Sequence, residues 1–179
     1  MRHLNDQQFD EWVERYADRL VRLAYTYERN WQTAEDRVQD AFVKAYKQYH
    51  QLRSQHEPFP WLARIVINEC KMSWRRTWKE VVTAWLPETK PQDSAETLFI
   101  NKLEADDLYG HVLNLSEPYR TPIILYYFEE LSVEAISHVL AVSKGTVKSR
   151  LARGRERLYR ALRKEDSHGA SVEKCKTTV

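Results

Sequence analysis

The sequence predicts an all-α protein made of two small helical domains that a flexible linker joins. Apolar residues recur at steps of three and four along most of the chain, which is the spacing of one face of an α-helix. Only 4 of the 179 residues are glycine, which disfavours an all-β protein. A polar stretch that contains two prolines, residues 81–104, weakens the helical pattern and is the predicted linker.

Three helices are expected in the N-terminal domain, residues 1–80. The first takes up most of residues 1–28, and its apolar stripe is Phe9, Trp12, Val13, Tyr16, Leu20, Leu23, Ala24 and Tyr27. A second stripe runs from Trp31 to Leu52 and consists of Val38, Phe42, Ala45 and Tyr49. After a turn-like segment at 56–60, a third helix carries Trp61, Leu62, Ile65, Ile67 and Met72. These three helices are expected to form one compact bundle.

The C-terminal domain is expected to span residues 105–164. Its apolar pattern begins near Leu108, breaks at the segment SEPYRTP (116–122) and resumes as IILYYF (123–128). Two short amphipathic runs follow, and Ser132 and Ser143 precede them as good N-cap residues. The last residues, 165–179, lack a core pattern, so we expect a mobile tail.

The two amphipathic runs are separated only by Ala141, Val142 and Ser143. Two helices joined by so short a turn make a helix-turn-helix, whose second helix lies in the major groove if the motif binds DNA. Periodicity alone favours equally a simple helical hairpin within a bundle. The facing of the second helix separates these alternatives.

At about 100° per residue, the second helix has one polar face and one apolar face. The polar face carries Lys148, Ser149, Ala152 and Arg153. The opposite side carries Val147, Leu151, Gly154 and Leu158. Hydrogen-bonding and positively charged residues opposite the apolar stripe favour groove binding, in which a lysine or arginine reaches guanine O6 and N7.

Charge is distributed unevenly along the C-terminal domain. Residues 106–143 carry six acids against one arginine, a net charge of −5, whereas residues 144–164 carry nine lysines and arginines against one glutamate, a net charge of +8. A run of residues with so large an excess of positive charge is typical of a surface that binds nucleic-acid phosphates. The flanking cations expected to hold phosphate are Lys144, Arg155, Arg157 and Arg160.

Several classes of protein are disfavoured. No apolar run approaches the roughly 18 residues of a membrane span, and the N-terminus does not resemble a signal peptide, so we expect a cytoplasmic protein without membrane insertion. Cys70 and Cys175 lie far apart without a second Cys or His at ligand spacing, which indicates reduced thiols and neither disulfide nor zinc. No carboxylate cluster suggests a catalytic site, so an enzyme and a bound cofactor are not expected.

Two motifs, in order along the chain, resemble the extracytoplasmic-function (ECF) sigma factors of bacterial RNA polymerase. The segment LSVEAISHVLAVSKGTVKSRLARGRERL (131–158) is similar to their C-terminal helix-turn-helix. The segments AEDRVQDAFVKAYKQY (34–49) and WLARIVINECKMSWRR (61–76) are similar to their polymerase-binding helix and the promoter-melting segment that follows it.

The resemblance implies an N-terminal sigma domain 2 and a C-terminal sigma domain 4, without a catalytic site. The implied partners are core RNA polymerase, through its β′ clamp helices and β flap, and promoter DNA. Anti-sigma factors, some of them membrane-anchored, are common partners in the family, so an anti-sigma factor is a further implied partner. Family members usually have glycine where Ala141 stands, so residue 141 either avoids a left-handed backbone or tolerates one at a cost. They often have an acidic or amide residue where Met72 stands, which bears on contacts to the −10 element.

By comparison with the family motifs, three groups of residues in this chain are expected to contact DNA or polymerase. Contacts to the −35 element are expected from Ser143, Lys144, Thr146, Lys148, Ser149, Ala152 and Arg153. Contacts to the −10 element, and its melting, are expected from Arg64, Asn68, Lys71, Trp74, Arg75 and Arg76. Core polymerase is expected to bind Asp36, Gln39, Asp40 and Val43.

The residues themselves agree with these assignments but leave alternatives open. Asp36, Gln39, Asp40 and Val43 lie opposite their helix's core stripe, which alone would indicate a solvated flank and, with the resemblance, indicates a docking face for a basic surface. Basic and aromatic residues together on the third helix fit a surface for single-stranded DNA, with Asn68 as the base contact. Trp61 is expected in the core, while Trp74 and Trp78 are assigned equally to core or DNA.

A free-standing transcriptional regulator of the response-regulator effector type, with a similar helix-turn-helix, is the competing hypothesis. Such a regulator would bind as a dimer on spaced half-sites. It would need no acidic docking face on the second helix, so that face discriminates between the two functions.

Overall fold

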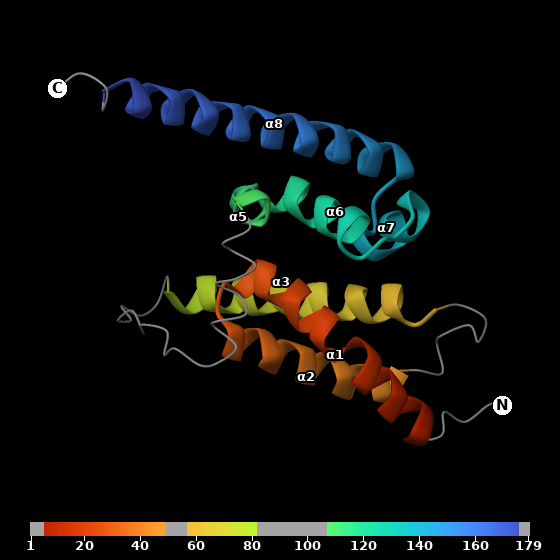
Figure 1. Cartoon of the computed structure of the whole chain (residues 1–179). Coiled ribbons are helices and arrows are strands. Elements are labelled where there is room, and N and C mark those ends of the chain that lie inside the picture. Colours follow the sequence, from red (N-terminus) through yellow and green to blue (C-terminus); the bar gives the residue numbers. More distant parts are fainter. Residues whose placement is uncertain (1–5, 49–56, 82–106, 176–179) are drawn as a thin grey trace. The chain divides into compact units, whose positions relative to one another are not determined.

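A computed structural model describes residues 6–48, 57–81 and 107–175, with side chains for 7–48, 57–73 and 108–163 (Figure 1). The described residues form seven α-helices and no strand, so the all-α prediction is confirmed. The chain divides into two compact units, one containing α1–α3 and the other containing α5, α6, most of α7 and α8, and each is described by itself. Apart from residue 81, the predicted linker lies outside the described residues.

The first unit is a three-helix bundle of α1 (Asp6–Glu28), α2 (Trp31–Gln48) and α3 (Phe59–Val81), in which every helix packs on the other two (Figure 1). Its core is formed by the buried side chains of Tyr16, Leu20, Leu23, Ala24, Ala34, Val38, Ala41, Phe42, Ala45, Phe59, Leu62, Ala63, Val66, Ile67 and Cys70. The predicted stripes of α1 and α2 therefore supply the core where their side chains are described. The outer residues of the α1 stripe, such as Phe9 and Trp12, are half-buried.

The chain turns sharply between α1 and α2. Arg29 has a left-handed backbone, with φ of 55°, and its N–H donates to Tyr25 O at 2.9 Å. Asn30 then caps α2, because its Oδ1 accepts the Thr33 N–H at 2.9 Å. This two-residue connection fixes the start of the helix that carries the predicted docking face.

On α3 the expected apolar pattern is confirmed only in part, because Leu62 and Ile67 are buried whereas Trp61 and Ile65 are half-buried and Met72 is exposed. The buried residues follow steps of three and four from Phe59 to Cys70. Met72 lies outside this stripe, and 52% of it is exposed. At about 100° per residue it is turned by about 200° from Cys70, so it cannot reach the same core.

The second unit contains α5 (Asp107–Asn114), α6 (Glu117–Tyr127), α7 (Val133–Leu140) and α8 (Lys144–Cys175). Helix α6 lies along α8, and α5 packs on both (Figure 1). The buried apolar side chains of this unit are Tyr109, Val112, Leu113, Leu115, Ile123, Ile124, Leu125, Leu131, Ile136, Val147, Leu151 and Leu158. Helix α8 passes residue 164, the predicted end of the domain, and continues to Cys175.

The predicted break at SEPYRTP is confirmed only at Ser116, because α5 ends at Asn114 and α6 already begins at Glu117, inside that segment. Pro118 is at the start of the helix, where the backbone N–H has no intrahelical partner and a proline costs nothing. Pro122 lies inside α6 and removes one backbone hydrogen bond, but its side chain is buried. Burial of the adjoining Ile123, Ile124 and Leu125 offsets that loss.

Candidate nucleic-acid and polymerase interfaces

The caps predicted for the helix-turn-helix are both present. Ser132 Oγ accepts the Ala135 N–H at 3.1 Å at the start of α7, and Ser143 Oγ accepts the Thr146 N–H at 3.1 Å at the start of α8. Each serine side chain therefore satisfies a backbone donor that the helix leaves unpaired. These bonds fix where the second helix begins.

Residue 141 adopts the left-handed backbone that the sequence left open. Ala141 has φ of 53° and closes α7, and the N–H of Val142 donates to Ser137 O at 3.1 Å. This is the hydrogen bond of a Schellman-type helix end, in which glycine is usual because it has no Cβ to clash. Ala141 thus tolerates the conformation at a cost.

The facing predicted for α8 is confirmed. Val147, Leu151, Gly154 and Leu158 are buried. The residues exposed on the other side are Lys148, Ser149, Ala152 and Arg153. Gly154 lies close to α6, since a Cβ built there would meet Ile123 Cγ1 at 3.0 Å. One side of α8 is therefore fixed against α6, and the opposite side is available to a partner.

Thr146 and Ser149 are tied to the first turns of α8. Thr146 Oγ1 lies 2.9 Å from Ser143 Oγ, and Ser149 Oγ donates to Thr146 O at 2.9 Å. Both hydroxyls retain hydrogen-bonding capacity because each oxygen also has acceptor lone pairs. These two residues can accept hydrogen bonds from amino groups on base edges without leaving a backbone group unpaired.

Two of the flanking cations are held in ion pairs. Lys144 Nζ lies 2.6 Å from Glu134 Oε1 on α7. Arg160 donates to Glu156 Oε1 at 2.5 Å, one helical turn earlier on α8. A cation that already has a carboxylate partner gains less from a phosphate than an unpaired one.

Two further cations lie against tyrosines. Arg155 donates to the Tyr127 hydroxyl at 3.3 Å, and this bond raises the pKa of Arg155. The Arg157 guanidinium lies over the Tyr119 ring, 4.5 Å from its centroid. Both tyrosines belong to α6, so these contacts join α6 to the flanks of α8.

Within the described side chains, no hydrogen bond, ion pair or ring contact engages Lys148, Arg150 or Arg153. Lys148 and Arg153 lie on the exposed face, and Arg150 is half-buried. The sequence could not show the contacts of Lys144, Arg155 and Arg157, because their partners lie on α6 and α7. The net charge of 144–164 therefore overstates the charge that is available to DNA.

The predicted docking face on α2 is exposed. Asp36, Gln39 and Asp40 are open to solvent, and 54% of Val43 is exposed although it is apolar. Asp40 forms an ion pair of 2.9 Å with Arg37, the residue three positions earlier. The face thus combines acidic groups with one apolar residue.

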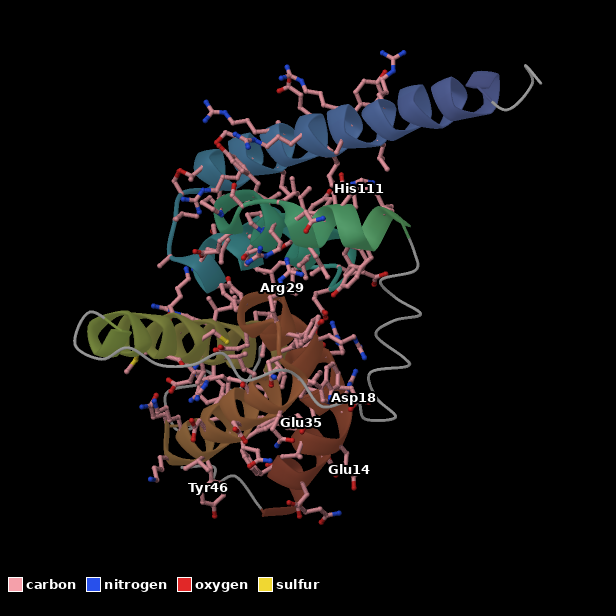
Figure 2. All side chains as sticks on the ribbon, turned by 90° about the vertical axis from the view of Figure 1, so that its left-hand side faces the viewer. Glu14, Asp18, Arg29, Glu35, Tyr46 and His111 are labelled. Carbon is pink, nitrogen blue, oxygen red and sulfur yellow. The ribbon has the colours of Figure 1, made fainter. Side chains whose placement is uncertain are left out.

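Tyr46 adjoins this face and was not among the predicted residues. It lies one turn beyond Val43, 48% of it is exposed, and Figure 2 shows it projecting from the bundle. Its ring packs edge-on against Phe9 of α1, with centroids 5.1 Å apart. The three-residue spacing from Val43 is the sequence signal that could have identified Tyr46.

On helix α3, the structure describes the side chains of only some of the residues predicted to contact the −10 element. Arg64 and Asn68 are exposed, whereas Lys71 is half-buried and interacts with other residues. Trp74, Arg75, Arg76 and Trp78 belong to α3, but their side chains lie outside the described residues. Trp61 is half-buried and contacts Trp12 edge-on, with centroids 6.5 Å apart.

A buried polar cluster joins the three helices of the first unit. Arg37 Nε lies 3.8 Å from Glu28 Oε1, too far for a hydrogen bond, and neither atom has another partner. Burial raises the pKa of Glu28, although Arg37 and a hydrogen bond with Cys70 oppose this. Burial, with the adjacent Glu28 charge, raises the pKa of Cys70 to about 12, so its thiol stays protonated at neutral pH.

The described residues contain no group of three side chains suited to hold a metal ion. No helix within the described ranges is long and apolar enough to cross a membrane.

Comparisons with known proteins identify both units. The family described as Sigma-70 region 2 matches residues 12–80, and Sigma-70, region 4 matches residues 109–158. The chain is 30% identical to the ECF RNA polymerase sigma factor SigW of Bacillus subtilis, across 87% of this chain and 89% of SigW. It is 32% identical to the RNA polymerase sigma-H factor of Pseudomonas aeruginosa, across 86% of each chain.

Solved structures share the fold. The sigma factor RpoE in complex with the anti-sigma factor NepR from Bartonella quintana matches with a TM-score of 0.71 and 24% identity, over 88% of this chain and 98% of that one. CnrH in complex with the cytosolic domain of CnrY matches with a TM-score of 0.66 and 22% identity, over 88% of this chain and 89% of that one.

The fold and the capped helix-turn-helix define a two-unit, all-α protein of the DNA-binding class. Because both sigma-70 regions match and relatives align over most of its length, the chain belongs to the ECF family of RNA polymerase sigma factors. It is a transcription initiation factor, and this membership implies that it is not an enzyme. A free-standing regulator is not favoured, because the region 2 match covers most of the first bundle.

Proposed function

We propose that this chain binds core RNA polymerase through α2 and directs it to promoters through α8 and α3. The observation that carries the proposal is the pair of exposed faces, each backed by a buried stripe on its own helix. A face whose reverse side is fixed in a core presents its side chains in a constant arrangement. The basic face suits DNA, and the acidic face suits a basic protein surface.

In the second unit, −35 recognition is assigned to the start of α8. Lys148 and Arg153 are exposed cations without a partner among the described side chains, and either can reach guanine O6 and N7. The hydroxyls of Ser143, Thr146 and Ser149 also lie at the start of α8 and supply shorter contacts. Ala152 lies between them and can contact a thymine methyl group.

In the first unit, α2 is assigned to the β′ clamp helices and α3 to the −10 element. Asp36 and Asp40 supply negative charge, and exposed Val43 supplies an apolar anchor. We add Tyr46 to this docking face, because exposed tyrosines held by neighbouring rings are frequent anchors in interfaces. On α3, the exposed amide of Asn68 can donate to and accept from an unpaired base.

Further partners follow from the family. We infer that the β flap of core polymerase contacts the second unit and that an anti-sigma factor regulates the chain. The named partners of the similar solved structures, NepR and the cytosolic domain of CnrY, support the second inference. The action of sigma factors on bacterial RNA polymerase supports a cytoplasmic location.

Gel filtration of the chain mixed with core polymerase tests the docking face. We expect the wild-type chain to co-elute with core, and Asp40→Lys combined with Gln39→Ala to bind at least about tenfold more weakly, because charge reversal opposes a basic surface. Asp18→Lys, at an exposed acidic position on α1, is the matched control and should co-elute normally. Unchanged affinity of the double variant, with an unchanged circular dichroism spectrum, would exclude α2 as the docking helix.

A further inference from the structure

Lys144 is distinguished from the other cations of the −35 face by its partner. Its Nζ lies 2.6 Å from Oε1 of Glu134, ten residues earlier and on the other helix of the motif. Both side chains are more than half exposed, at 56% and 63%, so the pair lies at the surface of the helix-turn-helix. The unpaired cations Lys148 and Arg153 lie on the same helix.

The position of Lys144 explains why it attracts a carboxylate. It is the first residue of α8, where the helix dipole and unpaired N–H groups create positive charge. A lysine there is repelled by its own helix, and Glu134 in the first turn of α7 offsets that repulsion. The contact also joins the two helices directly across their three-residue turn.

We propose that Glu134 competes internally with the DNA phosphates for Lys144 and thereby limits the affinity of α8 for the −35 element. This inference rests on the proposed DNA-binding role of α8. A lysine neutralised by its own protein displaces no counterion from DNA, whereas an unpaired lysine that contacts phosphate does. Lys144 thus adds to binding only when its contact with Glu134 is broken.

The test is a double-mutant cycle with the wild-type chain, Glu134→Gln, Lys144→Gln and the double variant. Each protein is assembled with core polymerase and bound to a labelled duplex, which wild-type holoenzyme has selected from a pool randomised over the −35 element. Affinity is measured over a series of salt concentrations. Glu130→Gln is the matched control, because it removes another exposed carboxylate from the same unit.

Glu134→Gln should raise affinity about two- to fivefold and steepen the salt dependence by about one unit, because one more lysine reaches phosphate. Lys144→Gln alone should change affinity by less than about twofold, and the double variant should match it. Glu130→Gln should change neither affinity nor slope appreciably.

Two results would overturn the competition. One is that Lys144→Gln alone lowers affinity and flattens the slope by about one unit, which means that Lys144 already contacts phosphate. The other is an equal gain from Glu134→Gln with and without Lys144, which means general repulsion from DNA. The DNA-binding role itself fails separately, if Arg153→Ala has no effect in the same assay.

Discussion

Arg153 lies on the exposed face of α8, and no described side chain engages it. We expect Arg153→Ala to cost about 1–3 kcal/mol on the preferred −35 sequence and to relax discrimination at one or two base pairs, as loss of a guanine contact does. Arg160→Ala is the control, since Arg160 is paired with Glu156 and should have a smaller, sequence-independent effect. Holoenzyme binding to wild-type and −35-mutated promoters measures both. A uniform loss for Arg153→Ala would mean that the helix is docked differently.

Glu28 should make the first unit less stable as pH rises, which is opposite to the usual effect of a carboxylate. Its pKa is raised mainly by burial, so folding favours the protonated carboxyl. A raised pKa in the folded state contributes stability that is fully present below the unfolded pKa and is lost as pH rises through the folded value. At neutral pH the ionised carboxylate therefore opposes folding.

Glu28→Gln should remove this dependence, because glutamine stays neutral at every pH. We expect the variant to gain stability relative to wild type as pH rises from about 4 to 7.5, above the ordinary pKa of a glutamate. Arg37 keeps its ion pair with Asp40 in the variant. Urea unfolding at several pH values measures the difference in unfolding free energy. A difference that does not vary with pH would show that Glu28 does not titrate in this range.

At the scale of the element, the helix ends of this chain carry strain. Arg29, Glu130 and Ala141 have left-handed backbones without being glycine. Ala141→Gly should stabilise the second unit by about 1 kcal/mol, because the exposed Ala141 side chain contributes little packing and its Cβ is unfavourable in this conformation. Thermal unfolding followed by circular dichroism measures the change. A lower midpoint would mean that glycine's flexibility in the unfolded chain outweighs the relieved strain.

Gly154 is predicted to respond in the opposite direction. An alanine there would lie 3.0 Å from Ile123 Cγ1 and 3.3 Å from its Cδ1. Alanine has the higher helix propensity, but Ile123 is buried and has little room to move, so Gly154→Ala should destabilise the unit by about 1 kcal/mol. The same melting experiment applies. A stabilised variant would show that α6 and α8 separate easily.

At the scale of the whole molecule, we propose that residues 1–80 are one domain and 105–164 another, with a linker at 81–104 and a tail at 165–179. Each described unit has its own buried core, so each should fold without the other. A fragment of residues 1–81 should be helical, unfold cooperatively and compete with the full chain for core polymerase. Circular dichroism and a competition gel-filtration assay test this. An unfolded fragment would mean that the first unit depends on the rest of the chain.

Patterns in the amino-acid sequence predicted the helical class, the three-helix bundle, both serine caps and the facing of α8. These features depend on residues a few positions apart, such as Ser143 and Thr146 or Val147 and Leu151, whose relation a helix fixes through its period. The two sigma-70 motifs are also continuous stretches of sequence, so the family could be recognised without the structure. The start of α6 inside the segment SEPYRTP was not predicted, because its two prolines are typical of a break between helices. A proline is tolerated at the start of a helix, and the burial that stabilises α6 comes from other elements.

The pairing of charged groups that lie on different helices could be seen only in the folded chain. The pairing of Lys144 with Glu134, and the contacts of Arg155 and Arg157 with tyrosines of α6, connect residues that helix periodicity cannot relate. The cluster of Glu28, Arg37 and Cys70 likewise takes one residue from each of three helices. The energy of a charge depends on distance and burial, and both are set by how helices pack.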